Sequence, residues 1–331
     1  MEPIFKSISK VGIVVSNLME TVETYCKKYG VGPWNIWDID RNQLKAATNI
    51  LDLKNYSFKI AQSYIGNTLW ELIEPKDSKS MFYQFLKIHG EGLYNLGYSV
   101  ENFDQVIEFA KKADIKLIYS GNWFGKRFAY LDTYEDLKHI AEIYSFEEDF
   151  KLPEPSYIYP ENNLNRIGKP VFKCMRQIGT AVLDIKKVAK TYNDKYGIGP
   201  WEFFKYFYPK AKNMRYNEEL LFTQRFTTAG AMIGEIEQEL MEPFDDYNVY
   251  SEYINFFGEG LQHISFDYNL NFDEAVDFHK KLGQKIKQSG SINGLIYNYI
   301  DSMDDLKIIS EPLFVPPDFM MPKRDYRYPY I

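Results

Sequence analysis

The chain has 331 residues, 45% of them hydrophobic and 17% aromatic, which predicts about two domains of ordinary size. Its net charge of −7 argues against the clustered basic surface by which proteins bind nucleic acids. The sequence has no apolar run near the length of about 18 residues that a membrane helix needs, and its amino terminus lacks a secretion signal. We therefore expect a cytoplasmic protein with neither a nucleic-acid nor a membrane partner.

The first elements in chain order are a strand and a capped helix. An apolar run at 8–15 predicts a strand, and apolar residues at helical spacing over 18–29 predict a helix. Asn17 is placed to cap the start of this helix, and Gly30 to end it. A Gly-Pro turn follows at once, so the segment predicts a strand, a helix and a turn.

Further elements follow with the spacing of small α+β units. The patterns predict strands at 34–39, 56–62 and 69–74, a helix at 80–89, a strand at 93–100 and a helix at 103–113. The order of these elements is typical of two βαβββ units in tandem.

This order of elements occurs twice, because the sequence repeats itself. Tyr29 to Trp34 returns as Tyr196 to Trp201, and the later landmarks Glu74-Pro75, Gly90-Glu91-Gly92 and Tyr130-Leu131-Asp132 return as Glu242-Pro243, Gly258-Glu259-Gly260 and Tyr299-Ile300-Asp301. The period is too long for a solenoid, whose repeats run about 20 to 50 residues, and indicates two copies of a complete domain. We expect a domain at 1–150, a linker at 151–170, a second domain at 171–315 and a surface tail at 316–331.

Five segments carry a resemblance to a known family. They are Val11-Gly12-Ile13-Val14-Val15 in the opening strand, the Gly-Pro-Trp turns, Trp70 to Pro75, Gly-Glu-Gly-Leu before the fifth strand, and Tyr-Leu-Asp-Thr or Tyr-Ile-Asp-Ser before the last. Together and in order, they resemble the vicinal oxygen chelate superfamily of glyoxalases, bleomycin-resistance proteins and methylmalonyl-CoA epimerases. The Gly-Pro-Trp turn is most similar to the epimerase branch. The resemblance implies an α+β fold in which tandem βαβββ units form one cupped, eight-stranded mixed sheet per domain.

The resemblance also implies a metal site in the second repeat. In the superfamily a divalent metal is bound inside the cupped sheet by one residue each from the first, fourth, fifth and eighth strands. The matching positions are Gln177, Glu239, His263 and Glu311. This donor set suits Mg²⁺, Mn²⁺, Co²⁺, Ni²⁺ or Zn²⁺, with one metal per chain expected. The order resembles some glyoxalases, whereas epimerases more often begin with His.

Strand periodicity supports an open space beside these residues. Alternate residues of a strand share a face, so Gln177 shares its face with Gly179 and Ala181, and His263 shares its face with Ser265. Such small neighbours leave room that a packed core would fill. The alternative is that both are hydrogen-bonded polar residues of the core.

The first repeat has a different set at the same positions, namely Lys10, Glu71, Asn95 and Glu142. A lysine ammonium repels a metal cation and is expected to pair with Glu71 or Glu142 instead. We therefore expect a degenerate, metal-free site, with the first repeat serving as a scaffold or binding an organic ligand.

Two functions remain open at this point. The resemblance implies a metal-dependent isomerase, epimerase or lyase that moves a proton next to a metal-bound carbonyl, with Glu311 and Glu239 as catalytic residues and a carbonyl or thioester compound as substrate. The alternative is a non-catalytic protein that binds or sequesters an aromatic ligand or drug, which the surplus of aromatic residues favours. A monomer or homodimer fits either function.

Two further observations bear on the site. Iron dioxygenases of the superfamily need two histidines and a carboxylate, but only His263 of the four histidines lies at a ligand position. Pro312 follows Glu311 directly, and a proline is usual only at the edge or bulge of a sheet, so it puts the geometry of Glu311 in question.

Overall fold

The structure, a computed structural model, describes residues 2–49, 57–148, 150–161 and 167–329. Its contacts divide the chain into two compact units, which we call the first unit (Ile4–Pro170) and the second unit (Met1–Pro3 with Val171–Ile331). Tyr56, part of the expected linker (162–166) and the end of the expected tail (330–331) lie outside the described residues.

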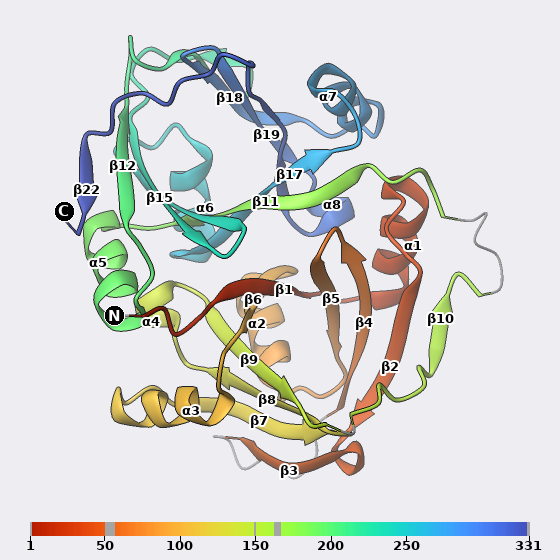
Figure 1. Ribbon diagram of the computed structural model, residues 1–331. Helices are drawn as coiled ribbons and strands as arrows, with labels where there is room; N and C mark the ends of the chain where they lie inside the picture. The colour runs from red at the N-terminus through yellow and green to blue at the C-terminus, as the bar shows by residue number, and fades with distance from the viewer. Residues whose placement is uncertain (1, 50–56, 149, 162–166, 330–331) are drawn as a thin grey trace. The chain divides into compact units, whose positions relative to one another are not determined.

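The first unit is built on a ten-stranded sheet with the order β10-β2-β4-β5-β1-β6-β9-β8-β7-β3 (Figure 1). Its strands are β1 (Ser7–Val14), β2 (Trp34–Asp40), β3 (Leu44–Asn49), β4 (Ser57–Ile65), β5 (Thr68–Pro75), β6 (Gly92–Ser99), β7 (Leu117–Trp123), β8 (Lys126–Leu131), β9 (Ile140–Phe146) and β10 (Tyr157–Tyr159). Its helices are α1 (Leu18–Tyr29), α2 (Met81–His89), α3 (Phe103–Lys112) and α4 (Tyr134–Leu137).

The second unit has a twelve-stranded sheet with the order β14-β13-β18-β19-β20-β17-β11-β16-β15-β12-β22, and β21 pairs with β19. Its strands are β11 (Phe172–Ala181), β12 (Trp201–Tyr206), β13 (Lys212–Tyr216), β14 (Glu219–Leu220), β15 (Phe226–Ile233), β16 (Ile236–Pro243), β17 (Gly260–Tyr268), β18 (Ile286–Ile292), β19 (Leu295–Asp301), β20 (Ile309–Glu311), β21 (Leu313–Phe314) and β22 (Tyr326–Tyr328). Its helices are α5 (Ile185–Tyr196), α6 (Val249–Phe257), α7 (Phe272–Lys281) and α8 (Met303–Leu306).

The α+β fold with mixed, curved sheets is confirmed, and each sheet contains the eight expected strands with additional strands at the edges. In each sheet the first strand of the repeat pairs in parallel with one neighbour and antiparallel with the other, as β1 does with β5 and β6. The added edge strands include β10 and β22, which lie in the segments expected as linker and tail. They pair equivalently, with Tyr159 beside Trp34 and Tyr328 beside Trp201, so both segments complete a sheet.

Local capping explains where the first helix of each unit begins and ends. The Asn17 side chain accepts a hydrogen bond from the Glu20 backbone amide at 3.2 Å, and Gly30 ends α1 in the left-handed conformation that glycine adopts most easily. Asp184 and Gly197 do the same for α5. The caps of α1 agree with the sequence expectation.

Helices of the two units cover equivalent parts of the sheets. Helix α1 packs against β4 and β5, and α5 packs against β15 and β16. Helices α2 and α6 contribute Phe82 and Tyr250 to the aromatic clusters on the inner faces of the sheets.

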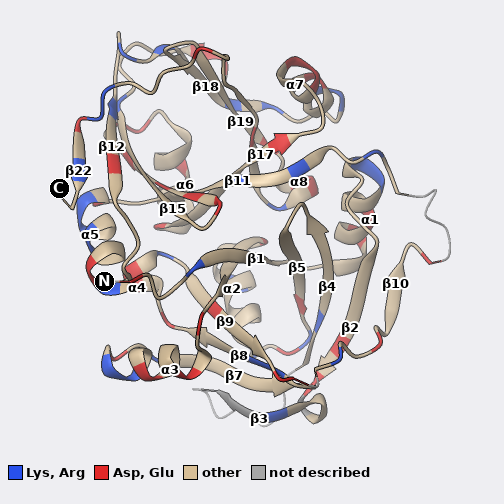
Figure 2. Cartoon of the chain, viewed as in Figure 1, with Lys and Arg blue, Asp and Glu red and all other residues tan. Residues whose placement is uncertain are grey.

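Acidic and basic residues are mixed along α3 and α7 (Figure 2). Of the described helices, none combines the length and the apolar character that crossing a membrane requires.

Candidate metal and ligand site

The centre of the second sheet brings the expected ligands into two neighbouring rows. In the first row, Gln177 lies between Ser265 and Glu237, and Ser265 lies beside Glu311. Because this row runs across four adjacent strands, β20, β17, β11 and β16, Gln177 and Glu311 are two strands apart on the same sheet.

The second row holds the other two expected ligands. Gly179 lies between His263 and Glu239. A Cβ atom at position 179 would lie only 1.9 Å from Cε1 of His263. The sequence suggested that Gly179 leaves a general opening beside the site. In the structure, the space at Gly179 is filled by the imidazole of His263.

His263 presents a free nitrogen to two carboxylates. Its Nδ1 lies 2.8 Å from Oε1 of Gln262, so Nδ1–H donates there, and in the neutral ring the lone pair is then on Nε2. Nε2 lies 3.4 Å from Oε2 of Glu311 and 3.7 Å from Oε2 of Glu239. Nε2 of His263 and Oε2 of Glu311 are buried and have no hydrogen-bond partner among the described residues.

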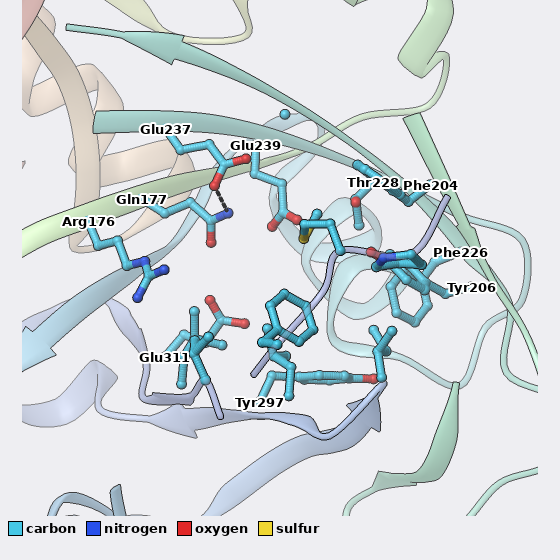
Figure 3. A pocket seen from close by; sticks show the side chains of 18 of the residues that line it. Arg176, Gln177, Phe204, Tyr206, Phe226, Thr228, Glu237, Glu239, Tyr297 and Glu311 are labelled. Atoms are coloured by element: carbon cyan, nitrogen blue, oxygen red, sulfur yellow. Dashed lines mark hydrogen bonds between the residues drawn. The ribbon is translucent and has the colours of Figure 1, made fainter. Parts of the chain in front are cut away.

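Gln177, Glu239 and Glu311 border a cavity of about 310 Å³. Figure 3 shows Gln177, Glu239 and Glu311 directed at one open space, with Arg176 at one end and aromatic residues at the other. The lining combines polar groups with apolar and aromatic walls, and includes Arg176, Gln177, Phe204, Tyr206, Phe226, Thr228, Glu237, Glu239, Tyr250, Ile292, Leu295, Tyr297, Tyr299, Glu311, Phe319 and Met321.

The cavity carries an excess of negative charge. Glu237, Glu239 and Glu311 line it, while Arg176 is the one cationic residue among its lining residues and is half-exposed. Burial, together with the charges of Glu311 and Glu237, raises the pKa of Glu239 well above its usual range. Burial also raises the pKa of Glu237. Buried carboxylates that lack a counter-charge are costly, so the site favours a cation or a proton.

In the first unit, a lysine neutralises the carboxylates at the corresponding positions. Lys10 is buried, forms an ion pair with Glu71 at 2.7 Å and also contacts Glu142. Asn95, at the position of His263, donates to Glu142 at 2.9 Å. The expected ion pair of Lys10 is therefore present, and it involves both carboxylates.

Bulky side chains also fill the first unit, where the corresponding cavity measures about 40 Å³. Trp123 and Lys126 face each other across the turn between β7 and β8, whereas the second unit has Ile292 and Leu295 at the equivalent pair. The second unit therefore has neither an indole nor an ammonium group at this pair of positions. The larger cavity follows from these exchanges.

Pro312 does not displace Glu311. It separates β20 from β21, yet β19 pairs with both in one continuous register, with Ile300 beside Ser310 and Tyr297 beside Leu313. The Asn298 amide still donates to the Pro312 carbonyl at 3.3 Å. The proline therefore interrupts the ladder and leaves the direction of the strand unchanged.

The other histidines have partners elsewhere. His139 and His279 are buried and hydrogen-bond through Nε2 to the hydroxyls of Tyr98 and Tyr268, and His89 stacks on Phe85. They do not lie among the residues lining the cavity of the second unit.

The donor atoms of the second unit are compatible with a metal, although no three His, Cys, Asp or Glu side chains in the described part of the chain are already arranged as a metal site. His263 and Glu311 offer two unpartnered donor atoms 3.4 Å apart. Two ligands that each lie about 2.1 Å from one metal are at most about 4 Å from each other, so this spacing fits. Glu239 adds a third donor near the same nitrogen.

Sequence reasoning missed Glu237, which also faces the cavity. Its side chain accepts a hydrogen bond from Nε2 of Gln177 at 3.0 Å. The available signal was the period of two in a strand, because Glu237 precedes Glu239 by two residues on β16 and must share its face.

Comparisons with known proteins agree with this fold. Residues 9–130 match the family model described as the glyoxalase/bleomycin resistance protein/dioxygenase superfamily. No curated protein matches the sequence. Among solved structures, a mutant of 4-hydroxymandelate synthase from Streptomyces coelicolor has a TM-score of 0.57 at 10% identity and covers 94% of this chain and 92% of its own.

Two further solved structures span most of the chain. A Mn(II)-bound glyoxalase from Novosphingobium aromaticivorans has a TM-score of 0.51 at 11% identity, covering 94% of this chain and 82% of its own. A halotolerant catechol dioxygenase has a TM-score of 0.50 at 12% identity, covering 97% and 91%. The family model therefore matches the first repeat, and it describes the group that the sequence resembles; over the whole chain, the solved structures show the same fold.

Proposed function

We propose that the second unit binds one divalent metal through Gln177, Glu239, His263 and Glu311 and acts as an isomerase, epimerase or lyase that moves a proton next to a carbonyl group. One observation carries this proposal. Nε2 of His263 is buried without a hydrogen-bond partner among the described residues and lies near Glu311 and Glu239, two carboxylates that border a cavity with no lysine in its lining.

The residues of the cavity have properties that suit acid–base chemistry. A bound divalent metal would supply Lewis acidity to a substrate carbonyl. Glu239 has a raised pKa, so its carboxyl group can hold a proton closer to neutral pH and return it. Glu311 has a buried oxygen without a partner that can accept a proton. Two carboxyl groups beside one space suit removal and return of a proton at the same carbon.

The walls of the cavity indicate how a substrate would be held. Arg176 lies at one end and can pair with an anionic group, whereas Phe204 and Phe226 at the other end can exclude water from an apolar group. The substrate class proposed here is a small carbonyl or thioester compound.

Metal analysis tests the proposal directly. Protein purified without chelators is expected to contain about one divalent metal per chain, and His263→Ala should lose it. His89→Ala is the matched control, because this histidine lies on α2 of the first unit. Proton exchange next to the carbonyl of acyl-CoA thioesters, thiol adducts and 2-oxo acids would then be followed by NMR in deuterium oxide. A wild-type chain without metal above background would contradict the proposal.

A non-catalytic binding protein is the second candidate, and the lining favours a particular ligand for it. Aromatic walls together with three carboxylates are suited to an organic cation, through cation–π contacts and ion pairs. Titration with benzyltrimethylammonium in EDTA distinguishes the two functions. Binding that persists without metal, and no proton exchange on any substrate, would favour the binding protein.

A further inference from the structure

We propose that Glu237 is a positioning residue that holds the carboxamide of Gln177 so that its oxygen, and not its amino group, faces the cavity. This inference rests on the proposed metal-binding function, because only the oxygen of an amide can bind a metal there. It concerns a residue outside the four expected ligands.

The hydrogen bond between the two side chains fixes the direction of the amide. Gln177 and Glu237 lie side by side on β11 and β16, and Nε2 of Gln177 donates to Oε2 of Glu237 at 3.0 Å (Figure 3). A carboxylate accepts hydrogen bonds and cannot donate them. The reversed amide would place two oxygens against each other, so the amino group is kept at Glu237 and Oε1 of Gln177 is turned to the open space.

Gly230 gives Glu237 the room to do this. A Cβ atom at position 230 would lie 2.2 Å from Oε1 of Glu237, so the carboxylate occupies the place where a side chain of residue 230 would begin. Glu237 is therefore held between Gly230 on one side and Gln177 on the other.

The first unit lacks all three features at once. The register places Lys10 at the position of Gln177, Leu69 at that of Glu237 and Gln62 at that of Gly230. There, Gln62 donates to Glu71 instead. The amide, the carboxylate and the glycine thus occur together in the unit whose cavity is open, and all three are exchanged in the unit where a lysine fills it.

Without Glu237 the amide of Gln177 would turn its amino group to the cavity. The same cavity is lined by the carboxylates of Glu239 and Glu311, which attract N–H donors. An amino group in that direction repels a cation. Residues that orient a metal ligand in this way typically contribute a factor of about 10 to 100 to metal affinity.

Titration of the purified chain with Co²⁺ tests the inference through metal affinity. We expect Glu237→Leu, which introduces the residue of the first unit, to weaken Co²⁺ binding about 10-fold or more. Glu237→Gln should have an intermediate effect, because its amide oxygen can still accept from Gln177. Gly230→Ala, which displaces the carboxylate without removing its charge, should also weaken binding. Glu235→Gln is the matched control, since this carboxylate is exposed in the turn before β16.

A double-mutant cycle separates positioning from simple charge. If Glu237 acts through Gln177, Glu237→Leu has no further effect in a Gln177→Ala background. If Glu237 only adds negative charge, Glu237→Gln and Glu237→Leu weaken binding equally, Gly230→Ala has no effect, and the loss persists in the Gln177→Ala background. That second pattern would overturn the inference.

A readout without metal distinguishes failure of this inference from failure of the proposed function. The side-chain NH₂ signal of Gln177, assigned by its loss in Gln177→Ala, should show a hydrogen-bonded proton in metal-free protein. The signal should lose this character in Glu237→Leu and keep it in Glu235→Gln. An NH₂ signal that is unchanged in Glu237→Leu would refute the positioning role, whether or not the chain binds Co²⁺.

Discussion

Gly179 and His263 lie directly opposite each other on β11 and β17, and the imidazole occupies the space where any larger residue at 179 would place its Cβ atom. Gly12 stands in the same relation to Asn95 in the first unit, where a Cβ atom would lie 2.0 Å from Oδ1. The same backbone arrangement thus admits an imidazole in one unit and an amide in the other.

This relation predicts that Gly179→Ala weakens metal binding. The added methyl group must push the His263 ring away from Glu239 and Glu311, so Co²⁺ affinity should fall at least about 10-fold, as for a disturbed ligand. Gly12→Ala is the matched control, since it introduces the same clash in the first unit. Equal Co²⁺ affinity in Gly179→Ala and wild type would contradict the assignment of His263 as a ligand.

The ion pair of the first unit predicts a large effect on stability. Lys10→Met removes the ammonium group that pairs directly with the buried carboxylates of Glu71 and Glu142, which should cost about 3–5 kcal/mol of unfolding free energy. The exposed pair of Lys6 and Glu101 gives the control, and Lys6→Met should cost less than about 1 kcal/mol. Denaturant unfolding can be followed by tryptophan fluorescence, because four of the five tryptophans lie in the first unit.

The same network predicts a pH dependence. Burial works against ionisation of Glu71, but Lys10 and Lys126 outweigh it and lower the pKa of Glu71. A carboxyl group with a lowered pKa stabilises the folded state at pH values above its pKa in the unfolded chain, which is about 4.3. This stabilisation is lost as the pH falls through the pKa of the folded state. In Lys10→Met the carboxyl groups are tolerated once protonated. The stability difference between variant and wild type should therefore shrink from pH 7 to pH 4, and a constant difference would argue against the network.

The raised pKa of Glu239 predicts proton release when metal binds. Burial, with Glu311 and Glu237 nearby, keeps a proton on this carboxyl group at a higher pH than usual, and a metal ligand must lose that proton. Co²⁺ binding should therefore release protons, and the affinity should fall as the pH is lowered. Calorimetry in buffers of different ionisation enthalpy measures the release, which Glu239→Gln should reduce and Glu235→Gln should leave unchanged.

The contrast in cavity size predicts that one exchange closes the second cavity. Ile292→Trp introduces the indole that Trp123 provides in the first unit, which should fill part of the space of about 310 Å³. Binding of benzyltrimethylammonium or of a substrate should fall, whereas Co²⁺ affinity should change little because residue 292 is not an expected ligand. Loss of both to the same extent would indicate that the variant disturbs the fold.

Much of this organisation could be predicted from the sequence because it depends on local signals. Asn17 and Gly30 act within one turn of α1, and the repeated Gly-Pro-Trp and Gly-Glu-Gly turns fix the order of elements. The resemblance then placed Gln177, Glu239, His263 and Glu311 on four strands, and the register brings them to one face. Their role as metal ligands remains a prediction.

The amino-acid sequence alone determined the repeat, the fold class and the difference in charge between Lys10 and Gln177, because these follow from residue types and their spacing. Tertiary structure alone decided three further points. Gln177 donates a hydrogen bond to Glu237 across the sheet, Pro312 leaves Glu311 in register, and Gly179 leaves room for the ring of His263. Each depends on which residues of distant segments become neighbours across a sheet, and that pairing is set by packing of the whole unit, so no local pattern encodes it.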